Sequence, residues 1–200
     1  MKKSLRFGPR KVDFYHNYKP NVKRGTALNM GCGFHIFKDK NVKWTNLDAY
    51  PAKGVDKVHN MNKFPYPFKA NTFDFIICDN VMEHLDSIIK PIEELWKISK
   101  PNAVIEIITP YIQSRGAFGH IDHQQYFDES TYFWYDAKRF HKDKVDLRDV
   151  RTSLNKVRFK IDYRLITTGR FRRYLPFKYI FNSFFWNVYD LIHYRLEVIK

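Results

Sequence analysis

The side chains best suited to proton transfer gather in one polar loop, residues 114–127. This loop contains His120, Asp122 and His123, and His84 lies in a second polar stretch earlier in the chain. An imidazole or carboxylate within hydrogen-bond reach can take the proton from a hydroxyl group during a reaction. We therefore predict His123 as a general base, with Asp122 or His120 orienting it and His84 as a further catalytic candidate. The alternatives are a loop-anchoring role for His123 and a half-buried structural role for His84.

The same loop has side chains of the kind that bind metal ions. His120, Asp122 and His123 are near neighbours in sequence, and adjacent residues of one loop rarely supply a full ligand set. The sequence therefore predicts no metal site. Cys32 and Cys78 lack the spacing of a zinc site, and we expect reduced, half-buried thiols in a cytosolic protein.

A second group of residues is suited to holding a ligand against bare backbone. Residues 27–30 form an apolar run without clean alternation, which is typical of a buried parallel strand. Gly31 and Gly33 follow at once, and they allow a sharp turn and the close approach of another molecule. Asp48 directly follows a second predicted strand, residues 43–47. In doubly wound nucleotide sites, a carboxylate at the end of the second strand hydrogen-bonds the ribose hydroxyls.

A third apolar strand is predicted at residues 73–78, and Asp79 and Asn80 follow it directly. The carboxyl ends of parallel strands meet at one edge of a sheet, where doubly wound folds bind their ligands. The three strand ends therefore predict a single binding crevice.

These motifs, in this order, resemble those of the class I methyltransferases that use S-adenosylmethionine. The matching segments are LNMGCG, NLDAYP and HNMNKFPYPFKANTFDFIICDNVMEHL, within residues 26–134. The resemblance is greatest to a subgroup often associated with polysaccharide biosynthesis. It implies S-adenosylmethionine bound across the two glycines, with its ribose at Asp48 and its adenine near Asn60. The residues assigned to the cofactor on this basis are Asn29, Met30, Gly31, Cys32, Gly33, Asp48, Ala49, Asn60, Met61, Asp79 and Asn80.

The chain departs from the family pattern at two places. Asn60 stands where the family usually has Asp, and its side-chain oxygen still accepts a hydrogen bond but carries no charge. Residues 34–42 barely span a parallel crossover, which usually takes about ten to twelve residues with its helix. The first helix should therefore be one or two turns at most, or missing, and backbone N–H groups of the loop would serve the cofactor instead.

The remaining segments complete one domain over residues 1–200, with a basic lead segment at residues 1–24. Helical spacing of apolar residues predicts a helix at 87–99, and a cap-like sequence predicts another that starts near 128–131. A strand follows at 104–108, and alternating strands at 157–167 and 193–199 suit a closing antiparallel pair. The expected fold is α/β and Rossmann-like: a doubly wound, mostly parallel seven-stranded sheet with an antiparallel last strand and a C-terminal aromatic helical insert.

The insert, residues 171–192, has a basic entry and many aromatic residues. It is predicted to be helical, with an apolar face formed by Phe177, Phe181, Phe184, Val188 and Ile192. Such a segment suits the interface of an anionic membrane, and we expect peripheral contact through residues 170–192. The alternatives are packing on the domain's own sheet, packing on a second subunit in a homodimer, or contact with nucleic acid.

The chain has 35 Lys and Arg against 21 Asp and Glu, a formal net charge of +14, which favours acidic partners. No apolar leader or membrane-length run is present, so we expect a cytoplasmic protein, peripheral at the inner membrane face. The predicted function is methyl transfer to a hydroxyl of a glycan or lipid-linked small acceptor. RNA methylation is an alternative that the charge favours, although the Asn-Pro-Pro-aromatic motif of base methylation is replaced by Asp79-Asn80-Val81-Met82. A scaffold that binds the cofactor without catalysis is the third hypothesis.

Overall fold

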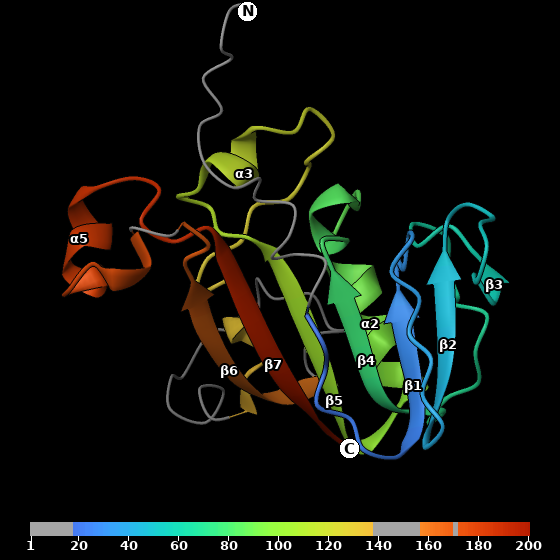
Figure 1. Cartoon of the computed structure of the whole chain (residues 1–200). Coiled ribbons are helices and arrows are strands. Elements are labelled where there is room, and N and C mark those ends of the chain that lie inside the picture. Colours follow the sequence, from blue (N-terminus) through green and yellow to red (C-terminus); the bar gives the residue numbers. More distant parts are fainter. Residues whose placement is uncertain (1–17, 138–156, 170–171) are drawn as a thin grey trace, which may run out of the picture.

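The computed structural model describes residues 18–137, 157–169 and 172–200, and its centre is a seven-stranded sheet (Figure 1). The strand order is β3-β2-β1-β4-β5-β7-β6, in which β1 to β5 run parallel to one another and β7 is antiparallel to both β5 and β6. The predicted mostly parallel α/β sheet with an antiparallel last strand is therefore confirmed. The strands are β1 (Gly25–Met30), β2 (Val42–Asp48), β3 (Lys57–Val58), β4 (Phe73–Asp79), β5 (Ser99–Pro110), β6 (Arg158–Ile166) and β7 (Leu191–Ile199).

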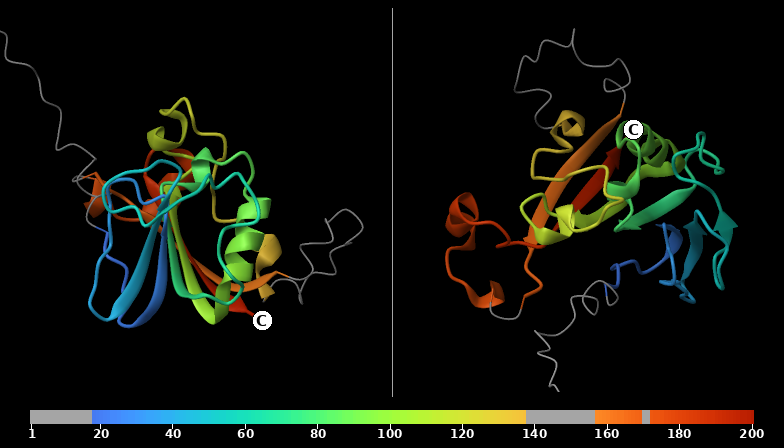
Figure 2. Two further views of the ribbon diagram at one scale, coloured as in Figure 1. Left: turned by 90° about the vertical axis from the view of Figure 1, so that its right-hand side faces the viewer. Right: turned by 90° about the horizontal axis from the view of Figure 1, so that it is seen from above.

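One face of the sheet is covered by α2 (Ile89–Ile98) (Figures 1 and 2). Its buried positions recur at helical spacing, and Pro91 lies in the first turn, where its missing N–H leaves no hydrogen bond unmade. Ile92, Leu95 and Ile98 are fully buried there in the main core. This apolar layer is what holds the parallel strands in place from β1 to β5.

The opposite face is covered differently. Ala27, Val42, Phe75 and Ile77 form a smaller buried cluster, against which Tyr18, Val22, Phe37 and Trp44 pack. Within the described residues it is the N-terminal segment and the first crossover, rather than a helix, that lie on this cluster. The doubly wound arrangement, with helices on both faces, is therefore not seen in the part of the chain that the structure describes.

The first crossover, residues 31–41, contains no helix, as the sequence predicted. Two asparagine side chains hold it instead. Asn46 accepts a hydrogen bond from Phe37 N (2.9 Å) and donates one to Phe37 O (3.1 Å), and Asn29 Nδ2 donates to His35 O (2.6 Å). Because both side chains are buried, these bonds are shielded from water and fix the loop firmly on the sheet.

The predicted helix near residues 128–131 is wrong. Asp128 Oδ1 instead accepts hydrogen bonds from Ser130 N (2.9 Å) and Thr131 Oγ1 (3.0 Å), which form a local turn. Up to residue 136, the 3₁₀ helix η2 (Phe133–Tyr135) is the one helical element that follows this turn. The local side-chain bonds compete here with helix formation, which the cap-like sequence alone did not reveal.

The insert is also not the single amphipathic helix that was predicted. It holds η5 (Arg172–Tyr174) and the seven-residue α5 (Lys178–Phe184), and Ile192 already belongs to β7. Phe177 has a left-handed backbone conformation (φ 52°) and precedes α5, so the predicted apolar face does not exist as one stripe. The short elements η1 (Met82–His84) and α3 (Arg115–Phe118) complete the described fold. Most of the predicted lead segment, residues 1–24, lies outside the described residues.

Candidate cofactor and acceptor site

The two glycines after β1 form a tight bend at the carboxyl edge of the sheet. Gly31 and Gly33 both have positive φ (68° and 49°), which side chains other than glycine rarely adopt. Gly31 N and Cys32 N donate to Leu47 O at 2.8 and 3.0 Å, which joins the bend to β2. No atom lies within 4 Å of the place where a β-carbon of Gly33 would stand. The backbone at Gly33 is therefore open to a ligand, as the cofactor prediction requires.

Asp48 faces this bend. Its Oδ2 accepts a hydrogen bond from Gly33 N (2.7 Å), and its Oδ1 accepts one from Tyr50 N (3.1 Å). A carboxylate offers about four acceptor positions, so two remain for the hydroxyl groups of a ribose. The carboxylate of Asp48, the last residue of β2, thus lies beside the glycine bend.

Three other residues of the predicted cofactor set point their side chains elsewhere. Asn29 is buried and holds His35 O, Met30 is fully buried in the main core, and the Cys32 thiol is 2% exposed. Burial raises the pKa of the Cys32 thiol to about 11, so the thiol is protonated at neutral pH. For these residues only backbone groups remain available to a cofactor.

The predicted adenine side is formed by a turn after β3. Asn60 Oδ1 accepts a hydrogen bond from Asn62 N (2.9 Å), which leaves one lone pair for an adenine amino group. Met61 is buried with Tyr66, whose hydroxyl donates to Met61 O (3.1 Å). Ala49 packs partly buried against the same core. The side chain of Asn60 and the backbone around it are therefore the groups that can meet adenine.

The end of β4 contributes a carboxyl group with altered acidity. Burial raises the pKa of Asp79 to about 7, and the hydrogen bond from Asn80 Nδ2 (2.8 Å) only partly offsets this effect. Asn80 has a left-handed backbone (φ 53°), and its N–H donates to Ile108 O (2.8 Å). Both residues thus lie at the same edge of the sheet as the glycine bend.

The structure brings all the predicted catalytic residues together. His84 Nδ1 lies 3.1 Å from Asp122 Oδ2, and His120 Nδ1 lies 3.8 Å from Asp122 Oδ1. The His123 ring lies edge-on to His84 (centroids 4.8 Å apart) and stacks with His120 (5.0 Å). His123 Nδ1 bonds to Ala117 O at 3.0 Å. Burial, with the nearby imidazoles of His84 and His120, lowers the pKa of His123, so this ring is neutral at neutral pH.

Glu83 was missed in the sequence, although it precedes His84 directly. Its side chain is buried, Thr109 Oγ1 donates to its Oε2 (3.0 Å), and its Oε1 has no hydrogen-bond partner. Burial raises the pKa of Glu83 to about 8. Its backbone oxygen accepts from Gln124 N (2.8 Å) and Gln125 N (3.1 Å), which ties η1 to the polar loop. The adjacent Glu-His pair was the signal that could have revealed it.

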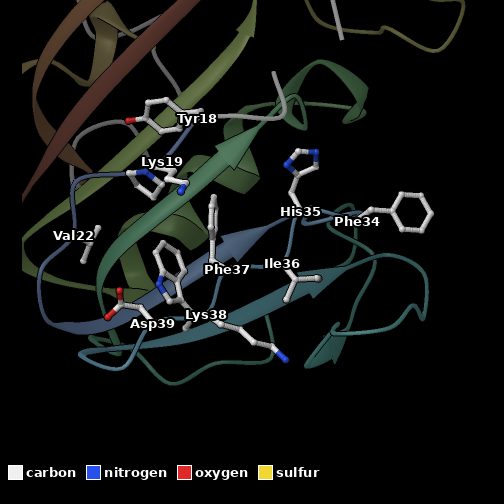
Figure 3. Close-up of a pocket in the computed structure, with 11 residues that line it drawn as sticks. Tyr18, Lys19, Val22, Phe34, His35, Ile36, Phe37, Lys38 and Asp39 are labelled. Carbon is white, nitrogen blue, oxygen red and sulfur yellow. The ribbon is translucent and has the colours of Figure 1, made fainter. Parts of the chain in front are cut away.

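A cavity of about 480 Å³ lies apart from these groups, between the N-terminal segment and the first crossover (Figure 3). Tyr18 and Phe37 line it, and none of the residues assigned from the sequence does. Phe34 lines its rim, with a ring that points away from Phe37 and is 92% exposed. The cavity is therefore distinct from the bend at Gly33 and Asp48.

Comparisons with known proteins agree with this geometry. A family model described as a methyltransferase domain matches residues 6–158. An uncharacterized protein of Methanocaldococcus jannaschii is 30% identical over 95 residues, which are 44% of this chain and 42% of that protein. The alignment thus covers less than half the length of this curated relative.

Solved structures share the fold at low sequence identity. An S-adenosylmethionine-dependent methyltransferase from Archaeoglobus fulgidus superimposes with a TM-score of 0.61 at 11% identity, over 94% of this chain and 90% of that one. A complex of the Haloferax volcanii Trm112 methyltransferase activator with a methyltransferase gives 0.56 at 11% identity, over 95% and 89%. The glycine bend, the carboxylate beside it and the matched domain lead to one conclusion: the chain belongs to the family of class I, S-adenosylmethionine-dependent methyltransferases.

Proposed function

We propose that this enzyme methylates a hydroxyl group of a glycan or of a lipid-linked small acceptor. The observation that supports this most directly is the cluster of His84, His120, Asp122 and His123 at the edge of the sheet. The donor's methyl group is already activated by the positive sulfur, so an oxygen acceptor mainly needs alignment and removal of its proton. A cluster of imidazoles suits the second task.

His123 is the proposed base. Ala117 O can only accept a hydrogen bond, so the Nδ1 of His123 bears the proton and its Nε2 presents a lone pair. In the transfer, the acceptor oxygen forms a bond to the methyl carbon, the carbon–sulfur bond breaks, and the hydroxyl proton passes to Nε2. Asp122 lies beside His84 rather than hydrogen-bonded to His123, so it positions the cluster through His84.

The cofactor is proposed to bind across Gly33 with its ribose hydroxyls on Asp48. Gly33 has open space beside it, and Asp48 retains free acceptor positions after bonding Gly33 N and Tyr50 N. Asn60 would accept from the adenine amino group. Phe34, which follows the bend and is 92% exposed, provides an apolar surface next to this crevice.

An exposed apolar surface supports a membrane-associated acceptor. We call it the aromatic surface. Phe118 of α3 contacts Trp186 of the insert (centroids 5.8 Å apart) and stacks with Tyr126 (4.8 Å), so this surface continues into the polar loop that holds His123. In Figure 1, α3 lies above the sheet and α5 lies to the left of it, beyond β6. Its members are Phe118, Tyr126, Tyr174, Phe177, Tyr179, Phe184, Phe185 and Trp186.

Exposed Phe, Tyr and Trp side chains beside cations suit the interface of an anionic membrane. Arg115 is exposed at the start of α3, and Lys178 opens α5. We therefore propose that the aromatic surface rests on the membrane and brings lipid-linked acceptors to the histidine cluster. None of the described helices is long and apolar enough to span a bilayer.

Two other occupants of this surface remain as alternatives. A structurally similar methyltransferase is known in complex with the Trm112 activator, so an activating partner chain is one. RNA is the other, because the net charge of +14 favours polyanions. Salt-dependent RNA binding, or tight capture of a purified activator, would favour these over the membrane.

The test is methyl transfer from labelled S-adenosylmethionine to a fractionated cell extract. We expect label in the lipid or glycan fraction, and label confined to RNA would contradict the proposal. Calorimetry with the cofactor distinguishes the enzyme from a scaffold that binds the cofactor without catalysis. Cofactor binding without methyl transfer to any fraction would support the scaffold hypothesis.

A further inference from the structure

The Glu83, His84 and His123 side chains have the composition and arrangement of a metal-binding site, although they come from different segments of the chain. Each offers one ligand atom, and these three atoms lie within 4.8 Å of one another. Ligands that share one transition-metal ion at about 2.0–2.2 Å lie a little closer than this, so small side-chain movements would close the set. We infer that Glu83, His84 and His123 bind a divalent transition-metal ion such as Zn²⁺.

His123 already has the tautomer that a metal ligand needs, and His84 lies beside a carboxylate. His123 donates from Nδ1 to Ala117 O (3.0 Å), and His84 Nδ1 lies 3.1 Å from the Asp122 carboxylate. A metal-binding histidine almost always directs its other ring nitrogen to a carbonyl or carboxylate, which fixes the ring and increases its basicity. The Nε2 lone pair of His123 is therefore left for an ion, and His84 can offer a ring nitrogen to the same ion.

Glu83 gives the independent indication of a ligand. The residue is 1% exposed, and its Oε1 is buried without a hydrogen-bond partner, while Oε2 is held by Thr109. An unpaired buried oxygen is costly, and native structures usually satisfy it with a protein group, water or an ion. Two imidazoles and one carboxylate make up a ligand set that suits Zn²⁺ and its first-row neighbours.

Three protein ligands leave at least one coordination position open, as catalytic metal sites do. If the acceptor hydroxyl takes this position, coordination lowers its pKa, and the proton leaves to solvent past Asp122, whose side chain is 63% exposed. The loaded enzyme would thus use His123 as a ligand, and the ion would replace it in activating the hydroxyl. This catalytic role rests on the proposed function, whereas binding of the ion does not.

The experiment uses the untagged full chain after treatment with a chelator. Zn²⁺ affinity is measured by competition with a chromophoric chelator, and Co²⁺ is added to record its visible absorption. We expect one ion per chain, with Zn²⁺ affinity reduced at least about tenfold in Glu83→Gln and in His123→Asn. His59→Asn is the matched control, since His59 bonds Lys63 O (2.8 Å) outside the cluster, and it should leave the affinity unchanged.

Binding of the cofactor, measured by calorimetry on every variant, verifies that each one is folded. If Glu83→Gln fails this check, His123→Asn in the polar loop still decides the matter. Absence of stoichiometric Zn²⁺ binding at micromolar concentration, or an equal loss in His59→Asn, would overturn the metal site. Equal methyl transfer by metal-free and reloaded enzyme would overturn only the catalytic role of the ion and would leave His123 as the base.

Discussion

Val81 packs against the backbone of Gly31 so closely that a β-carbon at residue 31 would lie 2.3 Å from Val81 Cγ2. At Gly33, two residues later, the corresponding position has no neighbour within 4 Å. The two glycines therefore serve different purposes. Gly31 allows the start of η1 to close against β1, whereas Gly33 keeps a surface bare for the cofactor.

Substituting each glycine by alanine should separate these purposes. Gly31→Ala should destabilise the fold by about 1–3 kcal/mol from overcrowding at Val81, in addition to roughly 1–2 kcal/mol of left-handed backbone strain. Gly33→Ala should incur only the strain and should still weaken cofactor binding. Denaturant unfolding and calorimetry measure the two effects. Equal stability of the two variants would contradict the packing role of Gly31.

Asp48→Asn should weaken S-adenosylmethionine binding by about 1–3 kcal/mol, because the ribose loses hydrogen bonds to a charged group. The amide keeps one oxygen for Gly33 N, so the bend itself should persist. Calorimetry provides the measurement. Asp39→Asn is the control, since Asp39 bonds Asn41 N in an exposed turn (2.7 Å). Unchanged affinity in Asp48→Asn would remove the ribose role.

His123→Asn should reduce methyl transfer by about 10²–10⁴-fold, the usual contribution of a general base, and should leave cofactor affinity nearly intact. Single-turnover transfer of labelled methyl groups and calorimetry measure these two quantities. His59→Asn controls for the loss of an imidazole elsewhere. Normal transfer by His123→Asn would exclude the residue from the reaction.

Replacing Phe184 and Phe185 by serine should weaken sedimentation with phosphatidylglycerol vesicles several-fold, because apolar area leaves the interface. Both rings are largely exposed, so the fold should tolerate the change. Tyr50→Ser removes an equally exposed ring outside the aromatic surface and serves as the control. Equal binding of all variants would show that the aromatic surface does not meet the lipid.

The stability of the enzyme should fall in acid through Glu106. Burial alone raises the pKa of Glu106, but the nearby His193 imidazole (3.5 Å), the hydrogen bond from the Tyr18 hydroxyl and the Arg195 guanidinium (2.9 Å) lower it overall. A carboxyl whose folded pKa is depressed stabilises the fold fully above its unfolded pKa of about 4.3, and this contribution is lost as the pH falls through the lower folded value. The free energy of unfolding between pH 7 and pH 3 measures this loss.

Glu106→Gln provides the comparison for that measurement. Arg195 is 56% exposed, so solvent screens the pair, and the loss of the carboxylate should cost less than the roughly 3–5 kcal/mol of a fully buried pair at neutral pH. The acid-dependent loss should become smaller in this variant. Arg164 donates to the Nδ1 of His193 (2.9 Å), so the cations around Glu106 stay in place. An unchanged pH profile would show that Glu106 does not control acid stability.

The sequence was most informative where local pattern and fold agree. Apolar runs that end at Gly31, Asp48 and Asp79 predicted the strand ends, because buried parallel strands consist almost entirely of apolar residues. The length of residues 34–42 alone predicted that the first helix would be very short or missing, and it is missing. The histidine cluster was predicted only as a set of candidates, since the contact between His84 and Asp122 depends on how two distant segments meet.

The failures have physical causes as well. The aromatic residues of 171–192 have helical spacing, but Phe177 takes a left-handed conformation and divides the segment. Asn46 and Glu83 act through buried hydrogen bonds. The partners of a single polar residue in an apolar stretch cannot be identified from the sequence around it. Tertiary contacts of this kind override local propensity and cannot be read from spacing.

The helix-free crossover at residues 31–41 also changes how the site treats charge. A helix that starts at a glycine bend brings roughly half a positive charge from its dipole, which repels the cationic sulfur of the methyl donor. The demethylated product has a neutral sulfur and the same adenosine and amino-acid groups, so it would escape that repulsion. Without this helix, the enzyme should favour donor over spent product more strongly than a relative that has one, and should be less prone to inhibition by its own by-product.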